Sequence, residues 1–144
     1  MAATTADVIV DRVRSILASP VFGFTEAVTW SSFDQQPDTN IDRVYRIPPP
    51  SSQRSAGGFG FTEDRTDVLQ IWVARKHHQD MHVTRSLLLR DVHSLTTAIL
   101  RDAHEASGDY GIPDEGRGHA IADVPRAAYV TLRLTLPVNY DCQF

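Results

Sequence analysis

Residues 67–76 read Asp-Val-Leu-Gln-Ile-Trp-Val-Ala-Arg-Lys, and this stretch decides how the rest of the chain is interpreted. It has the alternation of a β-strand, and apolar side chains fall on both of its faces: Leu69, Ile71 and Val73 on one, Val68, Trp72 and Ala74 on the other. A strand that is apolar on both faces is covered from both sides. We therefore expect a central strand of a sheet.

A long amphipathic helix is predicted after this strand, from about Thr84 to Ser107. At 100° per residue, its apolar side chains fall in one arc of about 140°. These side chains are Leu88, Leu89, Val92, Leu95, Ile99, Leu100 and Ala103. We expect this face to pack on a sheet, and Gly108 to end the helix in the left-handed conformation.

Two further strands are predicted near the C-terminus. Residues 119–124 form a short one, and residues 128–140 form the longest alternating stretch of the chain. Pro137 has no backbone N–H to donate to a neighbouring strand, which predicts a sheet edge there. The unpaired backbone groups of an edge strand can form hydrogen bonds with another chain. Residues 141–144 are expected to be a short tail.

The N-terminal third is predicted to hold one helix, two strands and a long loop. Residues 4–18 show a helical period, with Thr4 in a capping box, and residues 21–30 and 41–47 are typical of strands. Residues 48–60 contain three prolines, three glycines and three serines, which favours an extended loop.

The order of these elements predicts the fold class. The 144 residues are enough for one domain, which we take to span 1–144. A helix, two strands, a loop, a strand, a long helix and two strands indicate an α+β fold. In this fold the helices are layered on one mostly antiparallel sheet.

Charge and cysteine content exclude several classes of protein. Fourteen basic against eighteen acidic residues give a net charge of −4, which disfavours sequence-independent binding to nucleic acid. No apolar run approaches the roughly 20 residues that a bilayer requires, and the charged N-terminal stretch is unlike a signal peptide. The single cysteine, Cys142, excludes an intrachain disulfide and a multi-cysteine metal site, and a reducing compartment fits it best.

The histidines are the first candidates for chemistry. His78 and His82 have the i, i+4 spacing of metal ligands, but no third ligand follows at a standard distance. Three histidines follow one another at intervals of eleven residues: His82, His93 and His104. They lie on one stripe of the long helix, but their separation along the helix axis is too large for them to bind one metal ion. We expect them to pack at the border of the apolar face, and we expect no metal or cofactor.

No motif of a common enzyme class is complete. Gly58-Phe59-Gly60 has the start of a dinucleotide loop, but Glu63 stands where the third glycine belongs. No Gly-x-Ser-x-Gly segment presents a nucleophilic serine. The sequence therefore predicts a protein that is not an enzyme.

One pentapeptide, Phe-Gly-Phe-Thr-Glu, occurs twice, at residues 22–26 and 59–63. The flanking residues differ, so coincidence, a shared local role and aromatic anchors at an interface all stay open. We predict an interface near the second copy, in which Phe59 and Phe61 bury apolar area and polar residues fix the register. These polar residues are Arg54, Glu63, Asp64 and Arg65. The alternative is that both phenylalanines pack in the core of their own subunit.

The arrangement of the whole chain resembles the tail terminator proteins of long-tailed bacteriophages and the related minor tail and head–tail joining families. An N-terminal helix over 6–17 leads to strands and a Pro/Gly loop, the segment 68–73 feeds the long helix, and 128–136 is a closing strand. The resemblance implies a structural virion protein without catalytic residues. It implies a hexameric ring at the phage neck, assembled in the host cytoplasm, that caps the tail tube.

Such a ring has the tail tube protein and the head–tail connector or stopper protein as partners, and DNA passes through it without specific binding. The acidic balance is compatible with such a conduit. Three alternatives stay open: a head-closure or adaptor protein of the same neck, a monomeric module that binds a peptide by strand addition, and a histidine-based enzyme. The last would need a pocket in which a carboxylate, such as that of Asp80, lies beside one of four histidines: His77, His78, His82 or His119.

Overall fold

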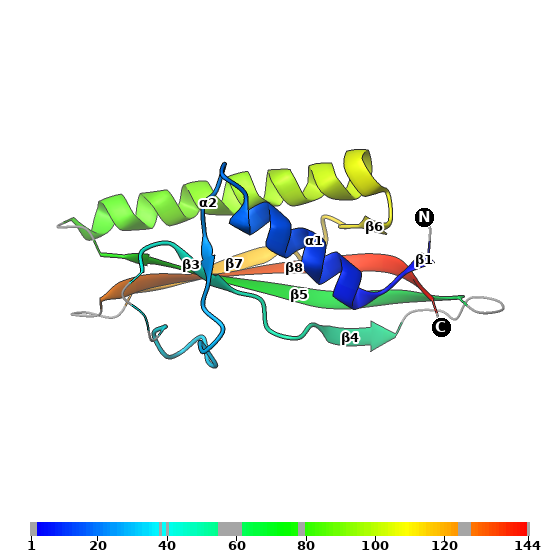
Figure 1. The fold of residues 1–144 in the computed structure, drawn as a ribbon, viewed down its shortest axis with the longest axis horizontal. Helices are drawn as coiled ribbons and strands as arrows, with labels where there is room; N and C mark the ends of the chain where they lie inside the picture. Colours follow the sequence, from blue (N-terminus) through cyan, green and yellow to red (C-terminus); the bar gives the residue numbers. More distant parts are fainter. Residues whose placement is uncertain are drawn as a thin grey trace.

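The fold is built on two long strands that pair with each other along their whole length (Figure 1). The computed structural model describes residues 3–37, 39, 41–54, 62–77, 80–123 and 128–143. Strand β5 (Thr62–Lys76) runs antiparallel to β8 (Tyr129–Gln143) in one unbroken register. Both strands were predicted from their alternation, but β5 begins five residues before the predicted start at Asp67, where its polar residues show no apolar alternation. The central place of β5 is confirmed, because β5 also pairs with strands on its other side.

Short strands attach to both sides of this pair. They are β1 (Ala3–Thr4), β2 (Thr25–Glu26), β3 (Val44–Arg46), β4 (Ser51–Arg54), β6 (Tyr110–Gly111) and β7 (Gly118–Asp123). β3 and β4 pair antiparallel with β5, whereas β6 and β7 pair antiparallel with β8. β1 is parallel to β8, and β2 is parallel to β3. Over the described residues this is one mostly antiparallel eight-stranded sheet, and the predicted α+β class is confirmed.

Helices α1 (Ala6–Ala18) and α2 (Met81–Arg101) lie on the same side of the sheet (Figure 1). Thr5 caps α1 by accepting a hydrogen bond from the backbone N–H of Val8, and Asp80 caps α2 by accepting one from His82. After Arg101 the helix continues as one π-helical segment, η1 (Asp102–Ser107). Gly108 ends it with a φ of +64°, the left-handed conformation predicted from the sequence.

The main core lies between the helices and the sheet. Leu88, Leu95, Ile99 and Ala103 of the predicted apolar arc are buried there, against the inner faces of β5 and β8. The arc is wrong at Leu89, which is 46% exposed. The sheet contributes a layer of branched side chains to this core: Leu69, Ile71, Val73, Val130, Leu132, Leu134, Leu136 and Val138.

A smaller core covers one part of the opposite face of the sheet. Trp30 packs edge-on against Trp72 with 5.4 Å between the ring centroids, and Tyr129 joins them. The indole of Trp30 donates a hydrogen bond to the backbone carbonyl of Gln35, which holds the covering segment in place. The apolar outer face predicted for the central strand is thus buried at Trp72 and Ala74, beneath an irregular segment and not beneath a helix, whereas Val68 is only half-buried and outside this core.

The boundaries predicted near the N-terminus differ from the structure. The helix predicted over 4–18 starts two residues later, and Thr5 caps it in place of Thr4, because Thr4 belongs to a strand paired with β8. The strands predicted at 21–30 and 41–47 are reduced to the two residues of β2 and the three of β3. Turns at residues 21–22 and 28–29 interrupt the first segment, and residues 41–43 and 47 of the second are irregular.

Further corrections concern the predicted loop, the long helix and the predicted tail. Within the loop expected at 48–60, residues 51–54 form β4 because the backbone of β5 offers them a pairing partner, and residues 55–60 lie outside the described residues. The helix predicted over 84–107 starts earlier, at Met81, and changes to π-helix over its last six residues. The tail predicted at 141–144 is ordered strand through Gln143, since β8 continues to pair with β1 and β5.

The edge predicted at Pro137 is also wrong, because β8 lies inside the sheet. Pro137 is paired with Val68 of β5 on one side. On the other side, pairing with β7 ends at Thr135 and pairing with β6 starts at Asn139. Pro137 therefore lies at an interval between two neighbouring strands, which is a local gap in the sheet on that side of β8 although β8 as a whole is not an edge strand.

Candidate interaction site

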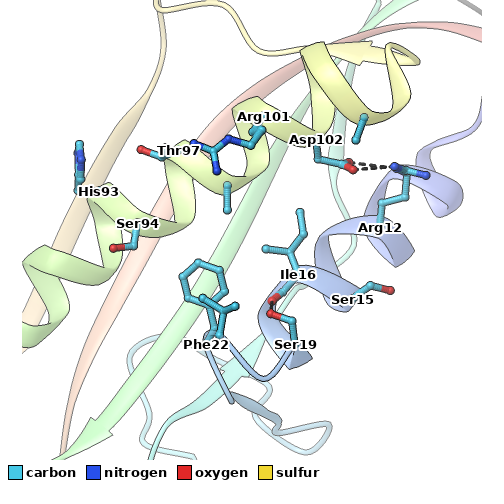
Figure 2. A pocket seen from close by; sticks show the side chains of 13 residues that line it. Arg12, Ser15, Ile16, Ser19, Phe22, His93, Ser94, Thr97, Arg101 and Asp102 are labelled. Carbon is cyan, nitrogen blue, oxygen red and sulfur yellow. Dashed lines mark hydrogen bonds and ion pairs between the residues drawn. The ribbon is translucent and has the colours of Figure 1, made fainter.

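An open groove runs between α1 and α2 on the helical side of the molecule (Figure 2). Its volume is about 750 Å³. We call it the groove throughout. Side chains from both helices and from the turn after α1 line it: Arg12, Ser15, Ile16, Ser19, Val21, Phe22, His93, Ser94, Thr97, Ala98, Arg101, Asp102 and Ala106.

The turn after α1 supplies the apolar part of the groove. Pro20 cannot continue the helix, and the backbone N–H groups of Phe22 and Gly23 donate to the carbonyl of Ser19. Gly23 has a φ of +66°, which permits the tight reversal. As a result Val21 projects into solvent with 85% of its surface exposed, and Phe22 points into the groove (Figure 2).

A network of polar side chains closes one end of the groove. Arg12 donates two hydrogen bonds to the carboxylate of Asp102, at 2.6 and 3.0 Å, and the hydroxyl of Tyr110 donates a third at 2.6 Å. The hydrogen bonds from Arg12 hold the pKa of Asp102 below its usual range, and burial beside this carboxylate raises the pKa of Tyr110. This network ties α1 to the end of α2.

Stability at this end is expected to depend on pH. The pKa of Asp102 is lower in the folded chain than in the unfolded chain, where it is about 4. The ionised carboxylate therefore contributes its full share to the free energy of unfolding above the unfolded pKa, and this share is lost as the pH falls through the folded pKa. The pair is partly exposed, so we expect Arg12→Gln to lower the free energy of unfolding by about 1 kcal/mol at pH 6 and by less at pH 2.5. Urea denaturation at both pH values measures this.

The control for this prediction is Arg101→Gln. Arg101 lies at the same end, but its ion pair with Glu105 is long, 3.8 Å, and exposed. Its loss should change stability little at either pH. An equal effect of the two substitutions would contradict the assigned role of Arg12.

The other end of the groove opens into a smaller cavity of about 210 Å³ that is rich in arginine. Arg43, Arg75 and Arg90 line it together with one carboxylate, Asp91. Arg75 donates two hydrogen bonds to Asp91, at 2.7 and 2.8 Å, and its guanidinium lies 5.6 Å from the centre of the Phe24 ring. We call this cavity the basic end, because the charges of Arg43 and Arg90 exceed what Asp91 neutralises.

Arg43 is held at the basic end by an unusual backbone. Its φ is +58°, a left-handed conformation that costs a residue with a Cβ about 1 kcal/mol or more. The guanidinium lies against Gly23, where a Cβ would stand only 3.2 Å from Nη2. The bare Cα of Gly23 thus leaves the space in which the Arg43 side chain rests.

Of the interface residues predicted from the sequence, those that the structure describes do not line the groove. Phe59 and Phe61 are outside the described residues. Arg54 belongs to β4, while Glu63, Asp64 and Arg65 belong to β5 at the end where that strand begins. Opposite them on β8, Asp141 faces Asp64, and the hydrogen bond between the two carboxyls raises the pKa of Asp64. Three acidic residues and two arginines, Arg54 and Arg65, therefore share this end of the sheet.

The described histidines are spread over the end of β5, the long helix with its π-helical segment, and β7. His82, His93 and His104 are exposed, so the packing predicted for them at the border of the apolar face is wrong, and His93 lines the groove. Asp80 caps α2. His119 is paired with Leu134 on β7, and His78 lies outside the described residues. Among the residues that the structure describes, no three His, Cys, Asp or Glu side chains are grouped as metal ligands.

Sequence reasoning missed the arginines and apolar residues of the groove. The sequence placed Val21 and Phe22 in a predicted strand, and Phe22 also in the repeated pentapeptide, but neither in a groove. The apolar pair Val21-Phe22 between Pro20 and Gly23 was the available signal for an exposed apolar turn. Arg43 and Arg90 carry no local signal, since the fold alone brings them together.

No protein-family model and no curated protein matches this chain. In the part of the chain that the structure describes, no helix is long and apolar enough to cross a membrane.

Proposed function

We propose that this protein is a structural component of a phage virion, a tail terminator that assembles into a hexameric ring at the neck. The ring caps the tail tube and joins it to the head connector or stopper. The order of elements supports this proposal: an N-terminal helix, a strand that leads into a long helix and a closing strand form one α+β unit. In such a ring DNA passes through the channel unbound, and the protein is part of the virion after assembly in the host cytoplasm.

The observation that carries the proposal is the open groove between α1 and α2. Its floor is apolar, and Val21 at its rim is almost fully exposed. An exposed concave apolar surface is typical of a site that a protein partner covers. The charged groups at its ends, Asp102 and Asp91, are engaged in structural ion pairs, so they suit fixed binding geometry more than proton transfer.

The test is the mass of the assembly in solution. Six copies of the 16.0 kDa chain form a ring of about 96 kDa, which light scattering coupled to gel filtration resolves from a monomer. We expect this species for the purified chain or after addition of tail tubes, and a ring at the tube end in negative-stain images. A single copy at the neck, or an open filament, would contradict the proposal.

A second candidate function, peptide binding by strand addition, rests on β7. Among the described residues β7 pairs only with β8, so its outer edge offers backbone groups to a further strand. The light-scattering measurement separates the two functions. A peptide-binding module stays monomeric at all concentrations and in the presence of tail tubes.

A further inference from the structure

The groove and the basic end form one continuous surface. Val21, Phe22 and Ser94 line both. A segment lying along this surface would meet apolar side chains first and then the guanidinium groups of Arg43 and Arg90. The matching ligand has aromatic or aliphatic side chains followed within a few residues by carboxylates.

The chain itself carries such a segment at residues 59–64, Phe-Gly-Phe-Thr-Glu-Asp, which we call the tip segment. It has two aromatic residues and then two acidic ones. The acidic character continues across the sheet, where Asp141 shares a hydrogen bond with Asp64. The two acidic residues of the tip segment are opposite in charge to Arg43 and Arg90 at the basic end.

The first copy of the pentapeptide shows how this sequence binds. At residues 22–26 the second phenylalanine, Phe24, is buried beneath the guanidinium of Arg75. The glutamate, Glu26, accepts a hydrogen bond from Arg14 at 3.2 Å. The same five residues at 59–63 have the chemistry to repeat this pairing of phenylalanine and glutamate with arginine.

The tip segment cannot reach the basic end of its own subunit. Thr62 and Arg75 are both on β5, thirteen positions apart, and a strand rises about 3.3 Å per residue, so about 43 Å separates them. Phe59 lies three residues before Thr62, a reach of about 10 Å. A tip segment that contacts Arg43 and Arg90 at the basic end must therefore come from another copy.

We infer that the groove, with its basic end, receives the tip segment of a neighbouring copy of this chain. This inference rests on the proposed self-assembly and identifies its contact. Phe59 or Phe61 of one copy packs on Val21 and Phe22 of the next, and the acidic residues face Arg43 and Arg90. Because the two surfaces differ and lie far apart, the contact is heterologous and extends from copy to copy until a ring closes.

The first experiment measures binding of a labelled peptide of residues 57–65 to the full-length chain by fluorescence anisotropy. We expect saturable binding. A peptide with serine in place of Phe59 and Phe61 should bind about tenfold more weakly or worse, since these residues carry the apolar contact. No binding, or equal binding of the two peptides, overturns the inference.

Substitutions in the groove locate the binding site. Val21→Asp and Arg90→Glu change exposed side chains, so folding should survive, which circular dichroism and thermal melting check. Each should weaken peptide binding about tenfold. Arg85→Glu is the matched control: it reverses a charge on the same helix but outside the groove, and it should bind as the wild type does. Unchanged binding to both groove variants overturns the inference.

Native mass spectrometry separates this inference from the proposed function. If the wild-type chain forms rings but the peptide does not bind, the tip contact is wrong and the ring stands. If the peptide binds but the chain never assembles, with or without tail tubes, the proposed ring is wrong, whereas the binding of the tip segment in the groove is supported. For an assembling wild type, a groove variant mixed with a Phe59→Ser, Phe61→Ser variant should give one-to-one dimers, since one intact contact stays possible. Rings in that mixture contradict the contact.

Discussion

Leu88→Ala is expected to lower the free energy of unfolding by about 3 to 4 kcal/mol. Leu88 is fully buried where α2 meets the inner face of the sheet. Removal of its side chain beyond Cβ loses the transfer free energy of the buried groups and leaves a cavity that the rigid sheet fills only in part. Urea denaturation followed by circular dichroism measures the change.

The adjacent residue gives a matched control. Leu89 is on the same helix but 46% exposed, so Leu89→Ala removes the same atoms without opening a buried cavity. We expect it to cost less than about 1 kcal/mol. Equal costs for the two substitutions would mean that α2 packs on the sheet with a different face.

The period of the sequence predicts α2 but not the difference between these two leucines. A helical period gives the direction of the apolar face to within one position, and Leu89 lies at the margin of that arc. Whether a marginal side chain is covered depends on what else packs beside the helix. Leu100 lies on the same margin of the arc and is partly buried against the core, as Val92 is in the middle of the arc, while Leu89 has no such cover.

The strands also fall into two groups: those that their own sequence pattern predicts and those that form only beside a neighbouring strand. β5 and β8 were predictable because each carries a long alternation with one face in the core. β1, β2 and β6 have two residues each, too few to show a period, and β4 consists of polar residues. These short strands form because a neighbouring backbone offers hydrogen bonds, which is information that the local sequence does not contain.

The candidate site was less predictable than the fold. The groove combines α1, the turn after it and α2, which are about 70 residues apart in the chain. The basic end adds Arg43 from a third segment. No local motif marks such a surface, whereas the repeated pentapeptide was visible at once and gains a structural meaning only from its first copy, in which Phe24 lies beneath Arg75.

Asp91→Ala is expected to have the second large effect, lowering the free energy of unfolding by about 3 kcal/mol. The ion pair between Asp91 and Arg75 joins α2 to β5 through two short hydrogen bonds, and the two side chains are only 9% and 12% exposed. Without Asp91 the guanidinium of Arg75 stays buried with no carboxylate to offset its desolvation. Asp11→Ala is the control, because the pair of Asp11 with Arg14 is exposed and contributes less than about 1 kcal/mol.

A double substitution separates two free energies: the penalty of leaving the Arg75 guanidinium buried without a carboxylate, and the net contribution of the Arg75–Asp91 ion pair to stability. If the large effect of Asp91→Ala comes from the unpaired guanidinium, Arg75→Met combined with Asp91→Leu should recover most of the lost stability, since apolar side chains of similar volume need no partner. In the double-mutant cycle formed by Arg75→Met, Asp91→Leu and their combination, the coupling free energy should be about 2 kcal/mol, well above the error of urea denaturation. Additive costs would instead mean that water reaches Arg75 and solvates it once Asp91 is gone. In that case the ion pair would contribute little more than an exposed one, and α2 would be held on β5 by its apolar face alone.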